Sequence, residues 1–171
     1  MIVVFVEGFD DKTFIESIFK EVNIKTVPYA NSKITKVDGI LKTYKETQTK
    51  YIFLADLDNK TPQKRKKELL SKYKNLIESN IFFSIQEIES WYLAGISDIY
   101  IKRYSVKDKF LNDTSDITKE KFNSIIKPKK DEDNQIVKAR ICDGYDLEKG
   151  LLRNVSLKIF YEKIYELDKC G

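Results

Sequence analysis

Two stretches decide the fold expected for this chain: Ile2-Val3-Val4-Phe5-Val6-Glu7-Gly8 (residues 2–8) and Tyr51-Ile52-Phe53-Leu54-Ala55-Asp56-Leu57-Asp58 (residues 51–58). Each begins as an unbroken run of apolar residues, many of them β-branched or aromatic, and each then reaches a carboxylate. Such runs are typical of strands that are buried on both faces. Strands of that kind belong to parallel sheets covered by helices, so the two stretches predict an α/β protein.

The sequence around these two stretches repeats the alternation of strand and helix. Strands that are separated by helical segments of 10 to 15 residues imply βαβ units and a mostly parallel sheet. We therefore expect an α/β fold with a Rossmann-like core, in which helices flank a mostly parallel sheet of about four strands. The predicted strands are residues 2–6, 24–29, 51–55 and 81–85, and the predicted helices are residues 10–22, 34–44, 62–77 and 87–94.

The pattern changes after Gly95. Residues 97–135 are charged and polar, and Lys127–Asn134 is expected to be a loop. Helical periodicity returns over residues 117–126 and, more strongly, over residues 156–167. We therefore predict a core over residues 1–95 and a mainly helical extension over residues 96–171 that packs on this core.

Composition limits the chemistry and the location of the protein. The 171 residues include no histidine, which excludes histidine-based nucleophilic catalysis and histidine zinc sites. The net charge of +4 is only mildly basic. Cys142 and Cys170 form no disulfide framework and are expected to be reduced thiols. The apolar start is too short for a signal peptide or a membrane span, so we expect a cytoplasmic protein without membrane association.

Carboxylates follow three of the four predicted strands. In an open parallel sheet, ligands bind beyond the carboxyl ends of the strands, so these side chains should share one edge. Alternate residues of a strand point the same way, which predicts that Asp56 and Asp58 lie on one side of the pleat. An oxygen-only cluster suits Mg²⁺ or Mn²⁺, which would also relieve repulsion among the acids. The acids concerned are Glu7, Asp10, Asp11, Asp56, Asp58, Glu87 and Glu89.

Each of these acids also has an ordinary structural interpretation. Acids at strand ends and helix starts often cap helices or lie in solvated turns. Asp10 in the first turn of its helix and Glu87 before the next helix fit that interpretation equally well. The metal hypothesis therefore depends on the whole set and its strand context. Removing charge from Glu7, Asp56 or Asp58 is expected to stabilise the metal-free fold slightly, because repulsion falls.

The segments Val6-Glu7-Gly8-Phe9-Asp10-Asp11 and Ala55-Asp56-Leu57-Asp58 together resemble the Toprim superfamily. That family combines a glutamate in a strand–Glu-Gly turn with an Asp-x-Asp at a later strand end. The Glu-Gly-x-x-Asp form is most similar to the OLD-family nucleases and the small nuclease that matures ribosomal RNA. The resemblance covers residues 1–95 well, and residues 96–150 match nothing in the family.

A third segment narrows the resemblance. Glu87-Ile88-Glu89-Ser90-Trp91-Tyr92-Leu93-Ala94 is similar to a segment of small stand-alone Toprim-like proteins. Those proteins often close with a Ser-x-x-x-Phe helix, as in residues 156–160. Two features depart from the family: the glycine that often follows Asp-x-Asp is absent, and the chain carries no ATPase, zinc-binding or helicase-binding module.

The resemblance implies metal-assisted cleavage of phosphodiester bonds in DNA or RNA. On that basis Asp56 and Asp58 hold the principal Mg²⁺ or Mn²⁺, and Glu7 acts as general acid/base or bridges to a second ion. Asp11 and Glu89 complete the metal shell. Such chemistry requires no histidine.

A basic helix follows Asp58 and could contact a nucleic-acid backbone. The candidate residues are Lys60, Lys64, Arg65 and Lys67, and their alternative is a solvated helix face in a lysine-rich chain. Trp91 and Tyr92 are expected in the core, with base stacking as the alternative.

Two further classes of function stay open from the sequence. The chain could be a non-catalytic nucleic-acid-binding or scaffold module of the Toprim type. It could instead work with a separate ATPase partner. The sequence does not fix the oligomeric state.

Overall fold

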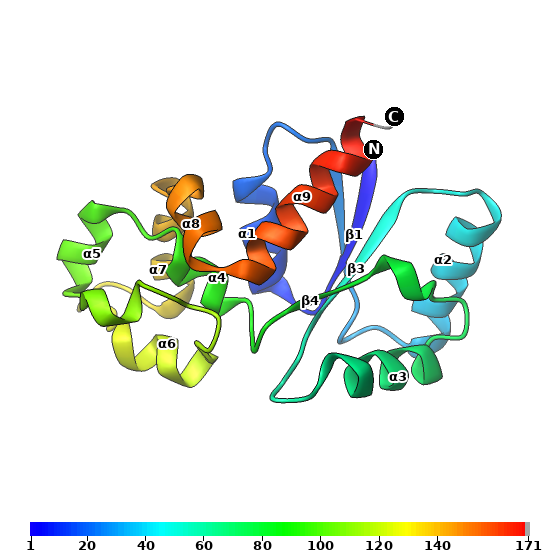
Figure 1. The fold of residues 1–171 in the computed structure, drawn as a ribbon, viewed down its shortest axis with the longest axis horizontal. Helices are drawn as coiled ribbons and strands as arrows, with labels where there is room; N and C mark the ends of the chain where they lie inside the picture. The colour runs from blue at the N-terminus through cyan, green and yellow to red at the C-terminus, as the bar shows by residue number, and fades with distance from the viewer. Residues whose placement is uncertain (170–171) are drawn as a thin grey trace. The chain divides into compact units, whose positions relative to one another are not determined.

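A computed structural model describes residues 1–169. It contains four strands: β1 (Ile2–Val6), β2 (Ile24–Pro28), β3 (Tyr51–Asp56) and β4 (Ile81–Ser84). Its helices are α1 (Phe9–Ile18), α2 (Ile34–Glu46), α3 (Pro62–Lys72), α4 (Glu89–Ala94), α5 (Asp98–Tyr104), α6 (Lys119–Ile125), α7 (Asn134–Asp143), α8 (Leu147–Arg153) and α9 (Val155–Lys169), as drawn in Figure 1.

The four strands form one parallel sheet in the order β2-β1-β3-β4. Strand β1 pairs with β2 through Ile2 opposite Ile24, and with β3 through Val3 opposite Tyr51. Every residue of β1 and β3 is buried, as expected for strands that are covered on both faces. The predicted α/β class with a parallel sheet of about four strands and flanking helices is therefore confirmed.

Contacts within the chain divide it into two compact units. The first comprises Met1–Phe83 together with the described chain from Glu162 onward, and the second comprises Ser84–Tyr161. This division differs from the boundary expected at residue 95, because α4 groups with the helices that follow it. The second unit thus begins at Ser84, the last residue of β4.

In the first unit, helices α2 and α3 cover one face of the sheet and α1 covers the other (Figure 1). The α2–α3 side has an aromatic core in which the Phe53 ring contacts those of Phe5, Tyr29 and Tyr73, with centroids 4.4 to 5.6 Å apart. Helix α3 begins at Pro62, where the hydroxyl of Thr61 accepts a hydrogen bond from the Lys64 amide at 3.3 Å.

The second unit joins the two segments of sequence that narrowed the family resemblance. The Trp91 indole donates a hydrogen bond to the Ser156 hydroxyl at 2.8 Å, and its ring lies 5.2 Å from that of Phe160. Ser156 in turn donates to the Asn154 side chain at 2.7 Å. Trp91 and Tyr92 are fully buried, so the expectation that they belong to the core is confirmed.

Gly95 is required by close packing in this unit. A Cβ atom at this position would lie 2.3 Å from the ring of Tyr145. That ring is fixed from both ends, since the Tyr145 hydroxyl donates to the Trp91 carbonyl at 2.7 Å and the following Asp146 amide donates to the Gly95 carbonyl at 2.8 Å. A larger residue at 95 would therefore displace the aromatic ring.

Several helices differ from the sequence-based expectation. Helix α3 ends at Lys72 and not at residue 77, because Tyr73 adopts an extended conformation (φ −118°, ψ 102°). Helices α5, α7 and α8 were not predicted, because residues 97–135 are polar and α7 places a charged residue, Lys138, in the core. The expected loop before α7 is present, and Glu132 pairs there with Arg103 and Arg140.

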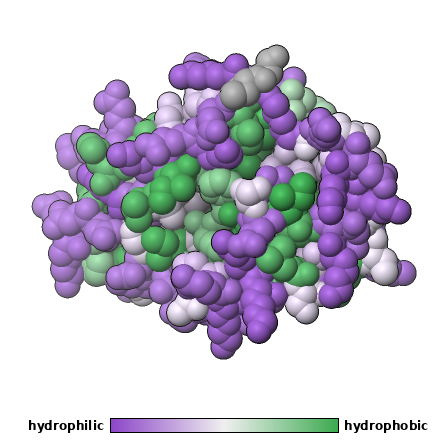
Figure 2. Space-filling view, turned by 45° about the vertical axis from the view of Figure 1, so that its right-hand side comes forward, coloured by the Kyte–Doolittle hydropathy of each residue, from purple (hydrophilic) through white to green (hydrophobic). Residues whose placement is uncertain are grey.

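Most large apolar side chains are buried, and hydrophilic side chains predominate on the face shown in Figure 2. Within residues 1–169, no helix has both the length and the apolar character needed to cross a membrane. Cys142 is a buried cysteine, and Cys170 lies outside the described residues.

Candidate functional site

Glu7 is the centre of the candidate site. It follows β1 directly, and alternation along the strand places it on the face of Val3 and Phe5, which helices α2 and α3 cover. Its Oε1 atom accepts hydrogen bonds from the Tyr29 hydroxyl at 3.0 Å and from the Arg65 guanidinium at 2.7 Å, and a longer one from the Asp56 amide at 3.4 Å. Strands β1, β2 and β3 and helix α3 therefore meet at one carboxylate oxygen.

Arg65 connects the acids that the sequence singled out. Its Nε donates to the main-chain carbonyl of Asp56 at 2.9 Å, and its Nη2 lies 3.6 Å from the Asp58 carboxylate. Burial lowers the pKa of the guanidinium, but Glu7, Tyr29 and Asp58 raise it by more, so the pKa lies above its ordinary value. Arg65 is a permanent cation between the ends of β1 and β3.

Tyr29 supports Glu7 from the end of β2. Its buried hydroxyl lies within hydrogen-bond distance of both the Glu7 carboxylate and the Leu54 carbonyl, at 3.0 and 3.2 Å. Burial is the main cause that raises the pKa of Tyr29, and the charge of Glu7 adds to it. The phenol is therefore neutral and can donate one proton, which helps to orient Glu7.

The turn after β3 differs from the expected Asp-x-Asp arrangement. Strand β3 ends at Asp56, and Asp58 and Asn59 both have left-handed backbones, with φ of 49° and 61°. The Lys60 amide closes this tight turn on the Leu57 carbonyl at 2.8 Å. Strand alternation therefore does not extend to Asp58, because β3 ends at Asp56. The expectation that Asp56 and Asp58 lie on one side of the pleat assumed a strand that continued to Asp58.

Aspartate and asparagine suit this turn because, among residues other than glycine, they tolerate positive φ best. The turn therefore forms without a glycine. Asp58 itself is half exposed, with 45% of its side-chain surface accessible, while Asp56 is nearly buried. Of the two, Asp58 offers its carboxylate to solvent.

Asp11 has a clear structural role. Its buried carboxylate accepts the Gly8 amide at 2.9 Å, from the third position of α1 back to the residue before the helix. This contact fixes the turn that follows Glu7. Asp10 lies in the first turn of the same helix, where a negative charge complements the helix dipole.

Glu87 and Glu89 belong to the second unit. Glu89 is buried and forms an ion pair with Lys138 at 2.7 Å, with each side chain 4% exposed. The Lys138 ammonium also lies 5.4 Å from the centre of the Tyr92 ring. Glu87 accepts a hydrogen bond from the Lys119 amide, at the start of α6. The carboxylate of Glu89 is thus already neutralised within its own unit, and its predicted place in a metal shell stays a prediction.

A pocket of about 240 Å³ opens beside Glu7. Its polar lining comes from Glu7, Tyr29, Arg65, Glu68 and Lys72. Glu68 is held there by Lys60 at 2.9 Å and by Arg65 at 3.7 Å. The pocket therefore contains alternating positive and negative groups rather than a single sign of charge.

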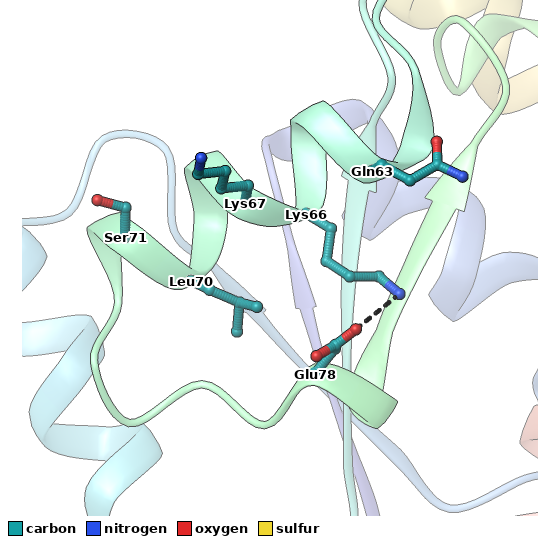
Figure 3. A pocket seen from close by; sticks show the side chains of 6 residues that line it. All are labelled: Gln63, Lys66, Lys67, Leu70, Ser71 and Glu78. Carbon is teal, nitrogen blue, oxygen red and sulfur yellow. Dashed lines mark ion pairs between the residues drawn. The ribbon is translucent and has the colours of Figure 1, made fainter.

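The predicted nucleic-acid-binding residues fall into two groups. Lys60 and Arg65 are engaged with acids of the site. Lys64 and Lys67 are exposed and make no ion pair within residues 1–169. Lys66, on the same helix, pairs with Glu78 at 3.2 Å across a second pocket (Figure 3).

The oxygen-only donor set suits a hard divalent cation, as Glu7 and Asp58 are partly exposed carboxylates. Within the described chain, however, no three acidic or cysteine side chains are already grouped closely enough to hold a metal ion. A guanidinium neutralises Glu7 and Asp58 instead. The donor atoms therefore suit Mg²⁺ or Mn²⁺ chemically, but the described residues do not form a complete coordination shell.

The sequence analysis did not assign Tyr29 and Arg65 the contacts with Glu7 that the structure shows. Tyr29 follows the second strand, so the rule that carboxyl ends share an edge could have identified it. Arg65 was assigned to the exposed basic face, because nothing in its spacing shows that it turns toward Glu7. The neighbouring side chains of Lys64 and Lys66 are also positively charged, but they point away from Glu7.

Comparisons of the chain with family models, curated proteins and solved structures find no match.

Proposed function

We propose that this protein cleaves phosphodiester bonds of nucleic acid, DNA or RNA, with the help of Mg²⁺ or Mn²⁺. The observation that carries the proposal is the convergence of the Glu7 and Asp58 carboxylates and the Asp56 main-chain carbonyl on one cation, the guanidinium of Arg65. A position at the carboxyl edge of a parallel sheet where several oxygen donors reach one positive charge suits a divalent cation and the phosphate it activates. The Toprim resemblance of the same residues supports this interpretation.

Each residue has a defined part in the proposed reaction. Asp56 and Asp58 hold the metal, and Glu7 accepts or returns a proton at its carboxylate. When bound, the metal activates water and stabilises charge on the scissile phosphate. Tyr29 orients Glu7 through the bond at 3.0 Å. Asp11 keeps the turn after Glu7 in place through the Gly8 amide. Arg65 supplies a positive charge beside the phosphate.

Thermal melting with and without Mn²⁺ tests the metal site. An ion that binds only the folded state at one hundred times its Kd adds about 2.7 kcal/mol of stability, so wild type should melt at a higher temperature with metal. Asp58→Asn should lose that shift, while the surface variant Glu46→Gln should retain it. A shift of wild-type size in Asp58→Asn would show that the metal is bound elsewhere.

Cleavage of labelled single-stranded and duplex DNA and RNA tests the reaction itself. Wild type should cut at least one of these substrates with Mn²⁺ and none with EDTA. Glu7→Gln and Asp58→Asn should reduce cleavage at least 100-fold, whereas Glu46→Gln should cut at the wild-type rate. Cleavage that survives EDTA, or that Glu7→Gln leaves intact, would contradict the proposal.

A second candidate function is a nucleic-acid-binding module without catalysis. It is favoured by Arg65, which already neutralises Glu7 and Asp58 without a metal. Binding of nucleic acid in EDTA, together with no metal-dependent shift and no cleavage, would favour this candidate. A separate ATPase partner stays a prediction, and cleavage by the purified chain alone would exclude an obligate one.

A further inference from the structure

Helix α3 carries a row of exposed cationic side chains around Glu68. Lys64, Lys67 and Lys72 are exposed and, within residues 1–169, make no ion pair. Together with Ser71 they occupy positions i, i+3, i+7 and i+8, which share one face of a helix. We call these four residues the α3 face. The eight helical steps from Lys64 to Lys72 span about 12 Å.

Three depressions connect the candidate site with this face. The pocket beside Glu7 shares Glu68 and Lys72 with a depression of about 470 Å³, which is also lined by Lys64, Lys67 and Ser71. That depression shares Lys67 and Ser71 with a third of about 510 Å³. The three depressions therefore follow one another, through shared lining residues, from the carboxylates across α3.

The third depression has a partly exposed apolar side chain, Leu70, among its polar ones. In Figure 3, Leu70 lies between Lys67 and the Lys66–Glu78 ion pair, and Gln63 lies at one end. Cationic side chains beside such a surface suit a ligand with regularly spaced negative charges and flat apolar groups.

We propose that the α3 face binds the sugar–phosphate backbone of a single nucleic-acid strand on its way to the cleavage site. The proposal rests on the proposed function, because it gives the substrate of that reaction its path. Charge complementarity identifies the occupant: three exposed ammonium groups, which make no ion pair within residues 1–169 and outnumber the one acid beside them, Glu68, complement a chain of phosphates. Leu70 favours a single strand over a duplex, whose bases are already stacked and paired.

The binding test is done in EDTA, so that no cleavage can occur. The affinity of a labelled single-stranded oligonucleotide is measured by fluorescence anisotropy between about 50 and 200 mM salt. For single strands, each neutralised phosphate contributes a slope of about −0.7 in log affinity against log salt. Replacing Lys64, Lys67 and Lys72 together by glutamine should therefore make the slope shallower by about 2, and replacing all three by arginine should leave it unchanged.

A matched control separates this surface from net charge. Lys20, Lys25 and Lys45 are exposed lysines of the same unit that line none of the three depressions. Replacing these three by glutamine removes the same charge and should leave the slope close to that of wild type. An equal change of slope in the control would overturn the proposed role of the α3 face. Tighter binding of wild type to a duplex than to the single strand would overturn it as well.

The result also distinguishes the surface from the function on which it rests. In one outcome, wild type binds and cleaves in the presence of metal while the glutamine variant shows the same salt slope as wild type. That result would overturn only the proposed role of the α3 face. No binding of any oligonucleotide to wild type would overturn both. A slope that becomes shallower in the glutamine variant alone supports the α3 face, whether or not the strand is cut.

Discussion

Removing the guanidinium at the centre of the site has the most direct consequence. Arg65→Gln eliminates the cation that contacts Glu7, the Asp56 carbonyl and Asp58. Glu7 then keeps the Tyr29 hydroxyl and the Asp56 amide but has lost its only neutralising partner in the described site. We expect the metal-free protein to be less stable than wild type.

The burial of the pair sets the magnitude. An exposed ion pair contributes about 0–1 kcal/mol, and breaking a fully buried one costs about 3–5 kcal/mol. The side chains of Arg65 and Glu7 are 16% and 25% exposed, so this pair lies between those limits, and we assign about 2 kcal/mol to its loss. The bond to the Asp56 carbonyl adds about 1 kcal/mol. Arg65→Gln should therefore destabilise the fold by about 3 kcal/mol.

Urea unfolding in EDTA at neutral pH measures this effect, and a double-mutant cycle isolates the pair. Arg65→Gln, Glu7→Gln and the double variant are compared with wild type, and we expect a coupling of about 1–2 kcal/mol. The neighbouring Lys64→Gln, which removes an exposed charge, should stay within about 0.5 kcal/mol of wild type. The same series with Mn²⁺ should show a larger metal-dependent gain in Arg65→Gln, because the metal no longer competes with a guanidinium.

The sign of the stability change in Glu7→Gln also distinguishes the sequence-based expectation from the one that the structure supports. Repulsion among carboxylates predicts that Glu7→Gln stabilises the metal-free protein slightly. The structure places a cation at 2.7 Å, so the same change should destabilise it by about 1–2 kcal/mol. A stabilising Glu7→Gln, or effects of the two single changes that simply add, would refute the assignment of Arg65 as the neutralising partner.

Three further predictions concern other parts of the chain. Asn59→Val should destabilise the protein by about 1–2 kcal/mol in urea unfolding, and Asn59→Gly should not, because the backbone at this position has φ of 61°. The Lys149 amide lowers the pKa of Asp146, so this carboxylate should stabilise the fold above about pH 4 and lose that effect as the pH falls; acid unfolding of Asp146→Asn should lack this component. Glu89→Gln should destabilise the fold by about 3–5 kcal/mol, because it removes the negative charge from the buried ion pair with Lys138, and a thermal melt that matches wild type would contradict this.

The sheet could be predicted from the sequence because its strands are buried on both faces. Such strands are continuous apolar runs, and the first predicted strand, residues 2–6, coincides with β1. The helices after residue 95 were harder to predict. Helix α7 buries Lys138 against Glu89 and Tyr92, and a charge at a core position conceals the apolar periodicity on which the prediction relies.

The position of the site could be predicted better than its contents. Glu7 and the acids after β3 lie at one sheet edge because parallel strands align their carboxyl ends. Whether a residue of α3 turns toward that edge depends on how the helix packs, which no local pattern records. Asp58 shows a related limit: a rule for strands fails where a two-residue turn with positive φ has already begun.

The charges of the site connect the proposed reaction with the proposed binding surface. Glu7, Asp58 and Glu68 contact only two cations, Arg65 and Lys60, among their ion-pair partners in the described chain. A divalent ion that takes over Glu7 and Asp58 would leave Arg65 in need of another anion. Arg65 lines the pocket that shares Lys72 with the α3 face, so the phosphate of an incoming strand can supply that anion. Metal and nucleic acid should then strengthen each other's binding by the same factor, because coupling between two ligands is reciprocal.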